Sequence, residues 1–439
     1  MKIEFGSIVF SILLFSLPSF SITLLESVRT ALQNNPKTAA NQMRVQAMQD
    51  QVRAQWKELI PSLRVSAGYN VNNYNETYDS TSNLTQTRSA NAGITTSMNI
   101  YDGGAARNSA KAGEASLKAM DARYSSSNAR IPNTKGSIAS DVVDAYISLI
   151  ESREQRNYSV STGQVLQTIL SAAATDDEKV LLEQRLNNLK TSLISIDSNI
   201  EDFKRTFQYV STAAAPDLES LQSLDEVIQA LVIPSNVQQA INIAMEKSPD
   251  LKVADYELES AKYQYQAEKS RLYSPQVDVH ASRTNDAGRI SGLSERSSTS
   301  SIGISVSFTL GASKALKESA AAKSVQASQL DHDGAVEELK YNIESTYPRL
   351  KAQEDLYLSQ DSNLKSAAAA LQAMLDKIQH GEKVDIKIVL SLLDSQSMYW
   401  MNALKQKKSI AYIHFNIERT IGTVFENAGL SHGTTTMIQ

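Results

Sequence analysis

The sequence predicts a mixed fold of long α-helices and transmembrane-type β-strands, with an internal duplication and four strands per protomer. Three observations predict it: an internal repeat, four segments in which polar and apolar residues alternate, and two long tracts with few helix breakers. The composition permits such a fold, because the 439 residues are 41% hydrophobic and 21% charged. The net charge of −5 provides no basic face, so nucleic-acid binding is set aside.

The first 21 residues differ from the rest of the chain. Lys2 precedes an apolar run from Phe5 to Leu17, and a small-residue site follows at 19–21. Since the run is shorter than the roughly 20 residues of a spanning helix, we expect a cleaved signal peptide at 1–21 rather than a membrane anchor. The chain has no cysteine, which excludes disulfides, thiolate metal sites and cysteine nucleophiles.

An internal repeat divides the remaining chain into two halves. Residues 31–36 are echoed by 244–249, and each copy ends a short helix at a proline. A second proline, Pro61 or Pro275, follows about 25 residues later in both copies. We therefore expect one repeat at 22–233, a second at 234–428, and a tail at 429–439.

Each repeat contains two segments that alternate with period two, the signature of a β-strand. Leu63, Val65 and Tyr69 point one way, for example, while Ser62 and Arg64 point the other. The polar stretches between the paired segments are expected to be long extracellular loops. The expected strands are at about 62–75, 88–101, 276–284 and 299–310, with the loops at 76–87 and 284–298.

A soluble hairpin could show the same alternation, but the length of the strands and the composition of their second face favour strands that cross a membrane. The strands are about ten residues long, enough to cross a bilayer when tilted. Their second face is Ser, Asn, Thr and Gly, which suits water. Four strands cannot close a barrel, so several copies must assemble. Two copies would give eight strands and a filled interior, whereas three would give twelve and leave room for a duct; the sequence does not fix the number.

The helix-forming tracts are too long for an ordinary domain. They run from about 104 to 172 and from 313 to 379, roughly 100 Å each, with antiparallel returns at 176–210 and 384–425. Apolar residues recur with a heptad spacing, which predicts coiled-coil packing. Pro132 and Pro348 should kink or interrupt the tracts. The residues at the heptad positions of the second tract are Val336, Ile343, Leu350, Tyr357, Leu364, Leu371 and Ile378. Those of the first antiparallel return are Leu182, Leu186, Leu189, Leu193, Ile196, Ile200, Phe203 and Phe207.

This order of elements resembles the TolC-type outer-membrane efflux and secretion family across nearly the whole mature chain. The helix breaks at 35–36 and 248–249, the closing prolines, Tyr101-Asp102-Gly103-Gly104 and Leu393-Asp394-Ser395-Gln396 carry the resemblance. The family implies a homotrimer in the outer membrane, a twelve-stranded barrel, a periplasmic helical tunnel, a periplasmic adaptor protein and an ABC or proton-driven inner-membrane transporter. The function implied is an exit duct, with type I protein secretion favoured over drug efflux.

The resemblance also implies where the partners and the tunnel mouth lie. The adaptor-contact turn corresponds to Gly381, Glu382 and Lys383, with Thr175 in the other helix turn. In the family, two aspartates just beyond the adaptor-contact turn form an acidic ring at the tunnel mouth. Aligned by spacing from Gly422, their positions correspond to Ile388 and Ser391. Aligned instead by the Leu-Asp-Ala-Gln match, one of them corresponds to Asp394. The candidates for charge at the mouth are Asp385, Asp394, Asp176 and Asp177, although a solvated outer helix face is an equally good reading.

No catalytic, cofactor-binding or metal-binding site is expected. The five histidines are scattered without metal-ligand spacing, and Gly103-Gly104 is followed by no phosphate-binding pattern, so it is interpreted as a strand-to-helix joint. The competing class is a secreted coiled-coil scaffold or adhesion protein, which would bind partners and conduct nothing. An enzyme is not expected, because no nucleophile, base and orienting group can be assembled.

Overall fold

The computed structural model describes residues 23–78, 81–126, 132, 134–171, 175–290, 293–308, 311–382 and 384–427; the predicted signal peptide and C-terminal tail lie outside them. The chain forms two compact units, and each draws on both halves of the sequence. Unit 1 comprises Met1–Thr38, Asn128–Ala244 and Asn342–Gln439, and unit 2 comprises Ala39–Ser127 and Met245–Tyr341. The sequence repeats therefore do not fold as separate domains.

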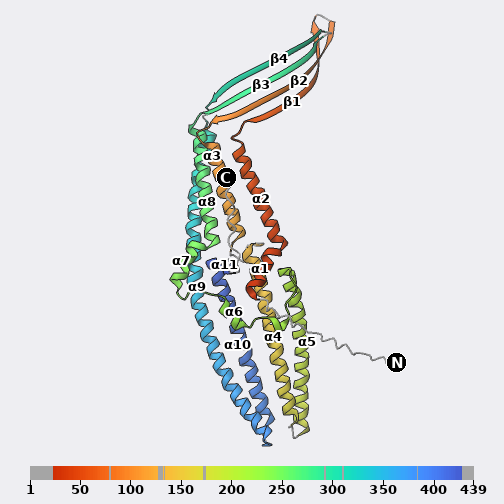
Figure 1. Ribbon diagram of the computed structural model, residues 1–439, viewed down its shortest axis with the longest axis vertical. Helices are drawn as coiled ribbons and strands as arrows, with labels where there is room; N and C mark the ends of the chain where they lie inside the picture. Colours follow the sequence, from red (N-terminus) through yellow and green to blue (C-terminus); the bar gives the residue numbers. More distant parts are fainter. Residues whose placement is uncertain are drawn as a thin grey trace, which may run out of the picture. The chain divides into compact units, whose positions relative to one another are not determined.

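The two halves of the chain repeat one order of elements (Figure 1). The first half contains α1 (Leu24–Asn34), α2 (Pro36–Lys57), β1 (Ser62–Tyr78), β2 (Thr81–Tyr101), α3 (Ala105–Tyr124), α4 (Lys135–Ser171) and α5 (Asp176–Ser211). The second contains α7 (Val237–Lys247), α8 (Pro249–Tyr273), β3 (Gln276–Ile290), β4 (Leu293–Ser307), α9 (Ala312–Gln379) and α10 (Ile386–Ile421). The short η1 (Leu218–Ser220) and α6 (Leu224–Ala230) join the halves, and α11 (Val424–Asn427) follows α10.

The short helices begin and end as the prolines predict. α2 and α8 start at Pro36 and Pro249, where the missing N–H would have had no helical partner. The start of α1 is fixed by a capping box in which Thr23 and Glu26 each accept a hydrogen bond from the other's backbone N–H.

The four strands form one antiparallel sheet in the order β1-β2-β3-β4. The predicted long loops at 76–87 and 284–298 are wrong, because pairing continues from Ser62↔Ser97 to Tyr78↔Thr81 and from Gln276↔Ser307 to Ile290↔Leu293. The apolar alternation fades toward these tips, but backbone groups still pair there. A polar strand end looks like a loop in sequence, since side-chain pattern reports the environment of each face and not the hydrogen-bond ladder.

The strand-to-helix joint after β2 depends on an aspartate and two glycines. Asp102 Oδ1 accepts from the Gly104 N–H at 2.9 Å, and Oδ2 accepts from the Ala106 N–H at 2.7 Å. Gly103 and Gly104 have φ angles of 69° and 84°, a region that glycine enters without strain. This segment therefore caps α3, as its interpretation as a structural joint anticipated.

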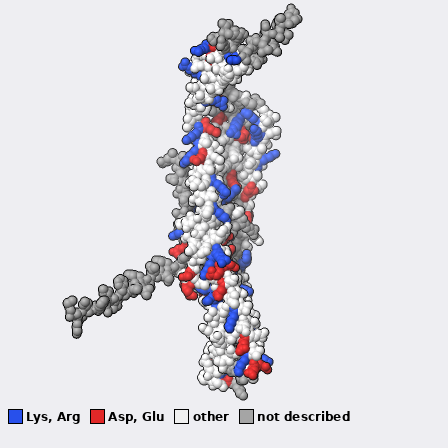
Figure 2. All heavy atoms as spheres, turned by 90° about the vertical axis from the view of Figure 1, so that its right-hand side faces the viewer, with Lys and Arg blue, Asp and Glu red and all other residues white. Residues whose placement is uncertain are grey.

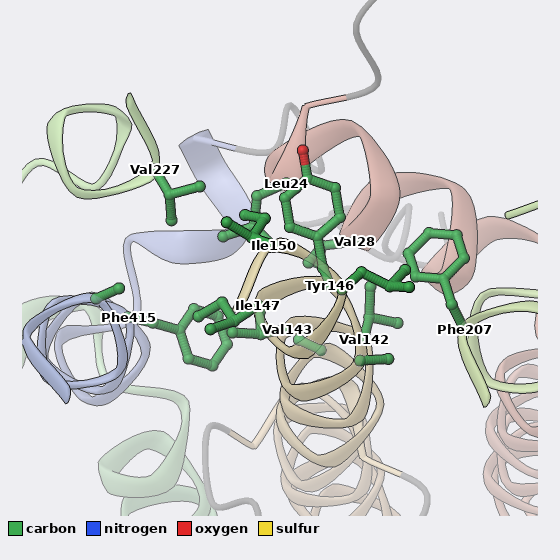
Figure 3. Packing of buried hydrophobic residues seen from close by; sticks show 14 of the residues in the cluster. Leu24, Val28, Val142, Val143, Tyr146, Ile147, Ile150, Phe207, Val227 and Phe415 are labelled. Atoms are coloured by element: carbon green, nitrogen blue, oxygen red, sulfur yellow. The ribbon is translucent and has the colours of Figure 1, made fainter. Parts of the chain in front are cut away.

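The core of unit 1 forms around α4. Val142, Val143, Tyr146, Ile147 and Ile150 line its buried side, and side chains from the elements around it converge on them (Figure 3). The Tyr146 and Phe207 rings lie 6.4 Å apart between centroids. The partners labelled in the figure are Leu24 and Val28 of α1, Phe207 of α5, Val227 of α6 and Phe415 of α10.

The heptad residues occupy the packed sides of their helices: every residue of the two predicted series is buried or half-buried. The two prolines behave differently. The predicted tract 104–172 is divided into α3 and α4, with Pro132 in the interval. In contrast, α9 continues through Pro348, so of the two expected effects, a kink or an interruption, the interruption does not occur. None of the described helices combines the length and apolarity needed to cross a membrane.

Candidate functional site

The start of α5 presents three of the predicted site residues. Thr175 Oγ1 accepts from the Glu178 N–H at 3.3 Å, and Glu178 Oε2 accepts from the Thr175 N–H at 3.1 Å. This capping box fixes the beginning of the helix. Asp176 and Asp177 occupy the exposed first turn, where the positive end of the helix dipole stabilises carboxylates.

The end of α9 is closed by Gly381. The Gly381 N–H donates to the Ile378 carbonyl and the Glu382 N–H donates to the Lys377 carbonyl, both at 3.0 Å. With a φ of 76° at Gly381, this is a Schellman motif, which ends a helix sharply. The Glu382 side chain is exposed, and Lys383 lies outside the described residues.

Asp385 begins α10 as its N-cap. Its Oδ1 accepts from the Lys387 N–H at 2.9 Å, and the side chain remains exposed. Asp385 therefore has a structural role in addition to any effect of its charge. Ile388 and Ser391, the positions that align with the acidic ring of the family, are exposed on the following turns.

Asp394 lies further along α10, nine residues after Asp385 and so about 14 Å along the helix axis. Its Oδ2 accepts from Arg185 Nη2 of α5 at 2.8 Å. The pair is partly exposed, with 57% of the Asp394 side chain and 45% of the Arg185 side chain accessible. Asp394 is thus neutralised by a partner and does not group with the acids at the turns.

One apolar cluster, which we call the turn cluster, joins the two helix hairpins of unit 1. It gathers buried side chains from α4, α5, α9 and α10, so the start of α5 and the turn between α9 and α10 lie at the same end of the unit. Figure 2 shows acidic and basic atoms side by side at this end, on the face that it presents. The members of the cluster are Leu166, Ile169, Leu182, Leu371, Ile386, Val389, Leu390 and Leu393.

The structure therefore brings Thr175, Asp176 and Asp177 to the same end as Glu382 and Asp385. Arg185 was missed by the sequence analysis, because it lies 209 residues from Asp394 and no local pattern connects them. The only signal in the sequence was the spacing of the apolar residues, which indicates the side of α5 that packs toward α10.

The sheet of unit 2 has two chemically different faces. Leu63, Val65, Ile302, Ile304 and Val306 are exposed on one face, at 67–86% of their full accessible area. The opposite face carries paired polar side chains: Asn99 donates to Asp278 at 2.9 Å, and the Ser282 and Ser301 hydroxyls lie 2.7 Å apart. Such a sheet suits hydrocarbon on one side and water on the other.

A partly buried polar network crosses from α4 to α10. Lys408 Nζ lies 2.6 Å from Glu151 Oε2. Burial raises the pKa of Asp144 above its usual range, while the hydrogen bond from Tyr412 opposes that shift. Burial also raises the pKa of Tyr412, and the Asp144 carboxylate adds to that rise. These groups lie within the helix bundle and are interpreted as structural.

A cavity of about 180 Å³ lies beside α6, α9 and α10 in unit 1. Lys407 Nζ is 2.6 Å from Asp225 Oδ2 and 5.2 Å from the centre of the Tyr357 ring, so the charged groups of this wall are already paired. Within the described residues, no group of three or more His, Asp or Glu is arranged to hold a metal ion.

Comparison with known proteins identifies similar sequences and structures. The family model described as "Outer membrane efflux protein" matches residues 28–178 and 240–386. No curated protein matches the sequence. Solved structures of the same fold include CusC (15% identity, 92% of this chain and 93% of that chain, TM-score 0.71), the MtrE outer membrane channel of Neisseria gonorrhoeae (15%, 94% and 91%, 0.70) and the outer membrane protein VceC of Vibrio cholerae (14%, 91% and 96%, 0.69). The predicted fold class is thereby confirmed.

Proposed function

Because the chain belongs to the outer membrane efflux protein family, we propose that it forms the exit duct of a tripartite export system. The protein lies in the outer membrane with a periplasmic extension, as the sequence predicted. In this proposal an inner-membrane transporter, ABC or proton-driven, and a periplasmic adaptor pass substrates into the duct, which releases them outside without changing them.

The observation that carries the proposal is the two-faced sheet with β1 and β4 at its edges. In hydrocarbon an edge strand must pair, because each unpaired backbone group costs several kcal/mol. Pairing of β1 in one protomer with β4 in the next satisfies both edges and closes a ring with the polar face inside. Three protomers give twelve strands, enough to enclose water, whereas eight strands enclose only side chains.

The absence of cysteine makes this assembly testable by disulfide cross-linking. Cysteine at Ser66 of β1 would be combined with cysteine at Thr299, Ser301 or Ser305 of β4. Within one chain the two strands are three spacings apart, about 14 Å, which is beyond the reach of a disulfide. We expect at least one pair to give covalent trimers, and the purified protein to form ion-conducting pores in lipid bilayers. A monomer without conductance would contradict the duct.

For the adaptor, we propose contact at Thr175 and at the Gly381–Lys383 turn. Support comes from the end of unit 1 they share, and from sharp caps that hold the exposed Glu382 in place. The Glu382→Lys variant should weaken adaptor binding in a pull-down at low salt. Glu338→Lys, an exposed change elsewhere on α9, should leave binding unchanged. Equal binding by all three proteins would remove the turn from the contact.

For the tunnel mouth, we propose that Asp176, Asp177 and Asp385 set the charge, with Asp394 contributing less because Arg185 neutralises it. Like carboxylates from three copies would attract cations. Asn at each position removes the charge, and Asn at 385 preserves the cap. Cation selectivity of single pores should fall for Asp176→Asn, Asp177→Asn and Asp385→Asn. It should change little when Asp394→Asn is combined with Arg185→Gln, because the double variant removes a pair of opposite charges. No change in any variant would exclude these residues from the pore.

For the cargo, we propose secreted proteins, as in type I secretion. The support is the resemblance of the Tyr101–Gly104 joint to secretion members of the TolC-type family. Efflux of small molecules is the alternative, favoured by the description of the matching family. Deleting the gene in its own cell separates the two. Loss of specific proteins from the culture medium supports secretion, whereas increased sensitivity to toxic small molecules with an unchanged set of secreted proteins supports efflux.

A further inference from the structure

The strand register sorts the charged side chains of the sheet onto two faces. Val65 pairs with Ile94, Ile94 pairs with Arg283, and Arg283 pairs with Ser300, so these positions share one face. By the same register this face also carries the exposed apolar residues Leu63, Ile302, Ile304 and Val306. We call it the apolar face.

Three arginines whose side chains the structure describes lie on the apolar face. Arg88 is paired with Val71, Arg283 with Ile94, and Arg296 with Ala287, and all three are exposed. None of the described side chains of this face is acidic. The acids Asp278, Asp286 and Glu295 fall on the opposite face, as does Arg64. The sorting is unexpected for a face in lipid, because arginine is costly in hydrocarbon.

Two of the arginines lie at nearly the same level of the sheet: Arg296 pairs with Ala287, which is in the row of Ala90, two residues from Arg88. Arg283 lies four residues nearer the helices than Ala287, in the row of Ile94. Reading each strand from its helix-linked end, the face-sharing residues of β2 are apolar or small from Met98 to Ala90 before Arg88. On β3, Arg283 follows Val277, Val279 and Ala281. On β4, Arg296 follows Ile302 after two serines. In each of these three strands, the first charged residue of the apolar face is therefore an arginine on the side away from the helices.

The outer-membrane location identifies what these arginines meet. The helices extend into the periplasm, so the far ends of the strands approach the outer leaflet. At the edge of a lipid-facing apolar band the neighbouring layer is made of headgroups. A guanidinium can bind a phosphate through two parallel hydrogen bonds, and the aliphatic part of arginine can stay against the apolar surface while its charge reaches the headgroup layer.

We propose that Arg88, Arg283 and Arg296 form a binding surface for the phosphate groups of anionic lipid headgroups in the outer leaflet. The surface would select anionic lipid around the sheet and fix its depth in the membrane. The proposal does not depend on the cargo or on the number of protomers.

The test uses the full-length protein purified in detergent and reconstituted in vesicles of phosphatidylcholine, alone or mixed with phosphatidylglycerol. After extraction, the lipids that stay bound are quantified by mass spectrometry. The wild type should retain phosphatidylglycerol several-fold above its bulk share, and its Tm should be higher in the mixed vesicles. The triple variant Arg88→Gln, Arg283→Gln, Arg296→Gln should retain it at its bulk share and lose the difference in Tm.

Arg64→Gln removes one arginine from the opposite face of the same sheet and should behave as the wild type. Unchanged enrichment in the triple variant would overturn the proposal. Competition by inorganic phosphate as effective as that by phosphatidylglycerol would also overturn it, since the surface would then bind free anions. If the triple variant does not assemble, Arg88→Gln and Arg296→Gln singly carry the same test, each with a partial loss expected. Pore conductance, measured in parallel, reports on the duct separately.

Discussion

Arg185 of α5 donates a hydrogen bond to Asp394 of α10 at 2.8 Å, and so links the two helix hairpins of unit 1. The pair lies close in sequence to members of the turn cluster, Leu182 and Leu393. Because both side chains are about half exposed, water screens their attraction. The apolar cluster therefore provides most of the cohesion between the hairpins, and the ion pair contributes mainly to their alignment.

This division predicts small effects for the ion pair. Arg185→Gln and Asp394→Asn should each lower the free energy of unfolding by less than about 1 kcal/mol, with a coupling energy of similar size in the double-mutant cycle. Urea denaturation at low and high salt measures it, and the coupling should shrink at high salt. A loss of about 3 kcal/mol from either single variant would mean that the pair is effectively buried.

Phe207 should matter far more than its neighbour on the same helix. Its side chain is 1% exposed and packs against Tyr146. Phe207→Ala should lower the free energy of unfolding by about 3–5 kcal/mol, because it leaves a cavity in the core. Tyr209→Ala, at a position that is 77% exposed, should change it by less than about 0.5 kcal/mol. Urea midpoints of the two variants make the comparison, and similar losses would contradict the assignment of this core.

The sequence predicted the repeat, the heptad stripes and the four strands because each leaves a periodic signal. Leu182 and Leu371 lie on stripes whose spacing is visible without coordinates. The strand tips were misread, since residues such as Thr87 and Ser298 are polar and yet paired. Pro348 does not end α9, because a long helix packed along its length can tolerate a local break in hydrogen bonding that an isolated helix could not.

The candidate site was predicted only in part. Thr175 and Asp385 were readable because caps leave local signatures. The pairing of Asp394 with Arg185 depends on a contact between distant segments. Arg296 was missed because residues 284–298 were predicted to be a loop. Since β4 begins at Leu293, the alternation of side chains along that strand puts Arg296 on the face of Ile302.

His414 should make stability depend on pH. Burial lowers its pKa below the usual 6.5, although the Leu231 carbonyl and Glu354 oppose the shift. Between the lowered pKa and 6.5 the unfolded chain binds more protons than the folded one. The contribution of neutral His414 to the free energy of unfolding is therefore fully present above pH 6.5 and is lost as the pH falls through the pKa of the folded state. The measurement is the urea midpoint at several pH values from about 5 to 7.

The His414→Gln variant should flatten that dependence, because glutamine cannot take up the proton. Asn416→Gln, at an exposed position of the same helix and without an ionisable group in either form, serves as the control and should keep the slope of the wild type. A slope that is the same in the wild type and His414→Gln would assign the pH dependence to other groups.

Two glycines of the same helix region should respond in opposite directions to alanine. Gly334 lies inside α9, and a methyl group there would meet no atom within 4 Å. Alanine should therefore stabilise the helix by about 1 kcal/mol. Gly381 is equally uncrowded, but its φ is 76°. Alanine there should cost about 1 kcal/mol, because its Cβ disfavours the left-handed conformation that closes α9.

Since neither substitution produces a clash, the sign of the change reports backbone conformation alone. Urea denaturation of Gly334→Ala and Gly381→Ala separates the two effects. Asn, which tolerates the left-handed region better than alanine, should recover part of the loss at 381. Stabilisation by alanine at 381 would mean that the turn does not hold this conformation in solution, and the exposed position of Glu382 would then no longer follow from the cap.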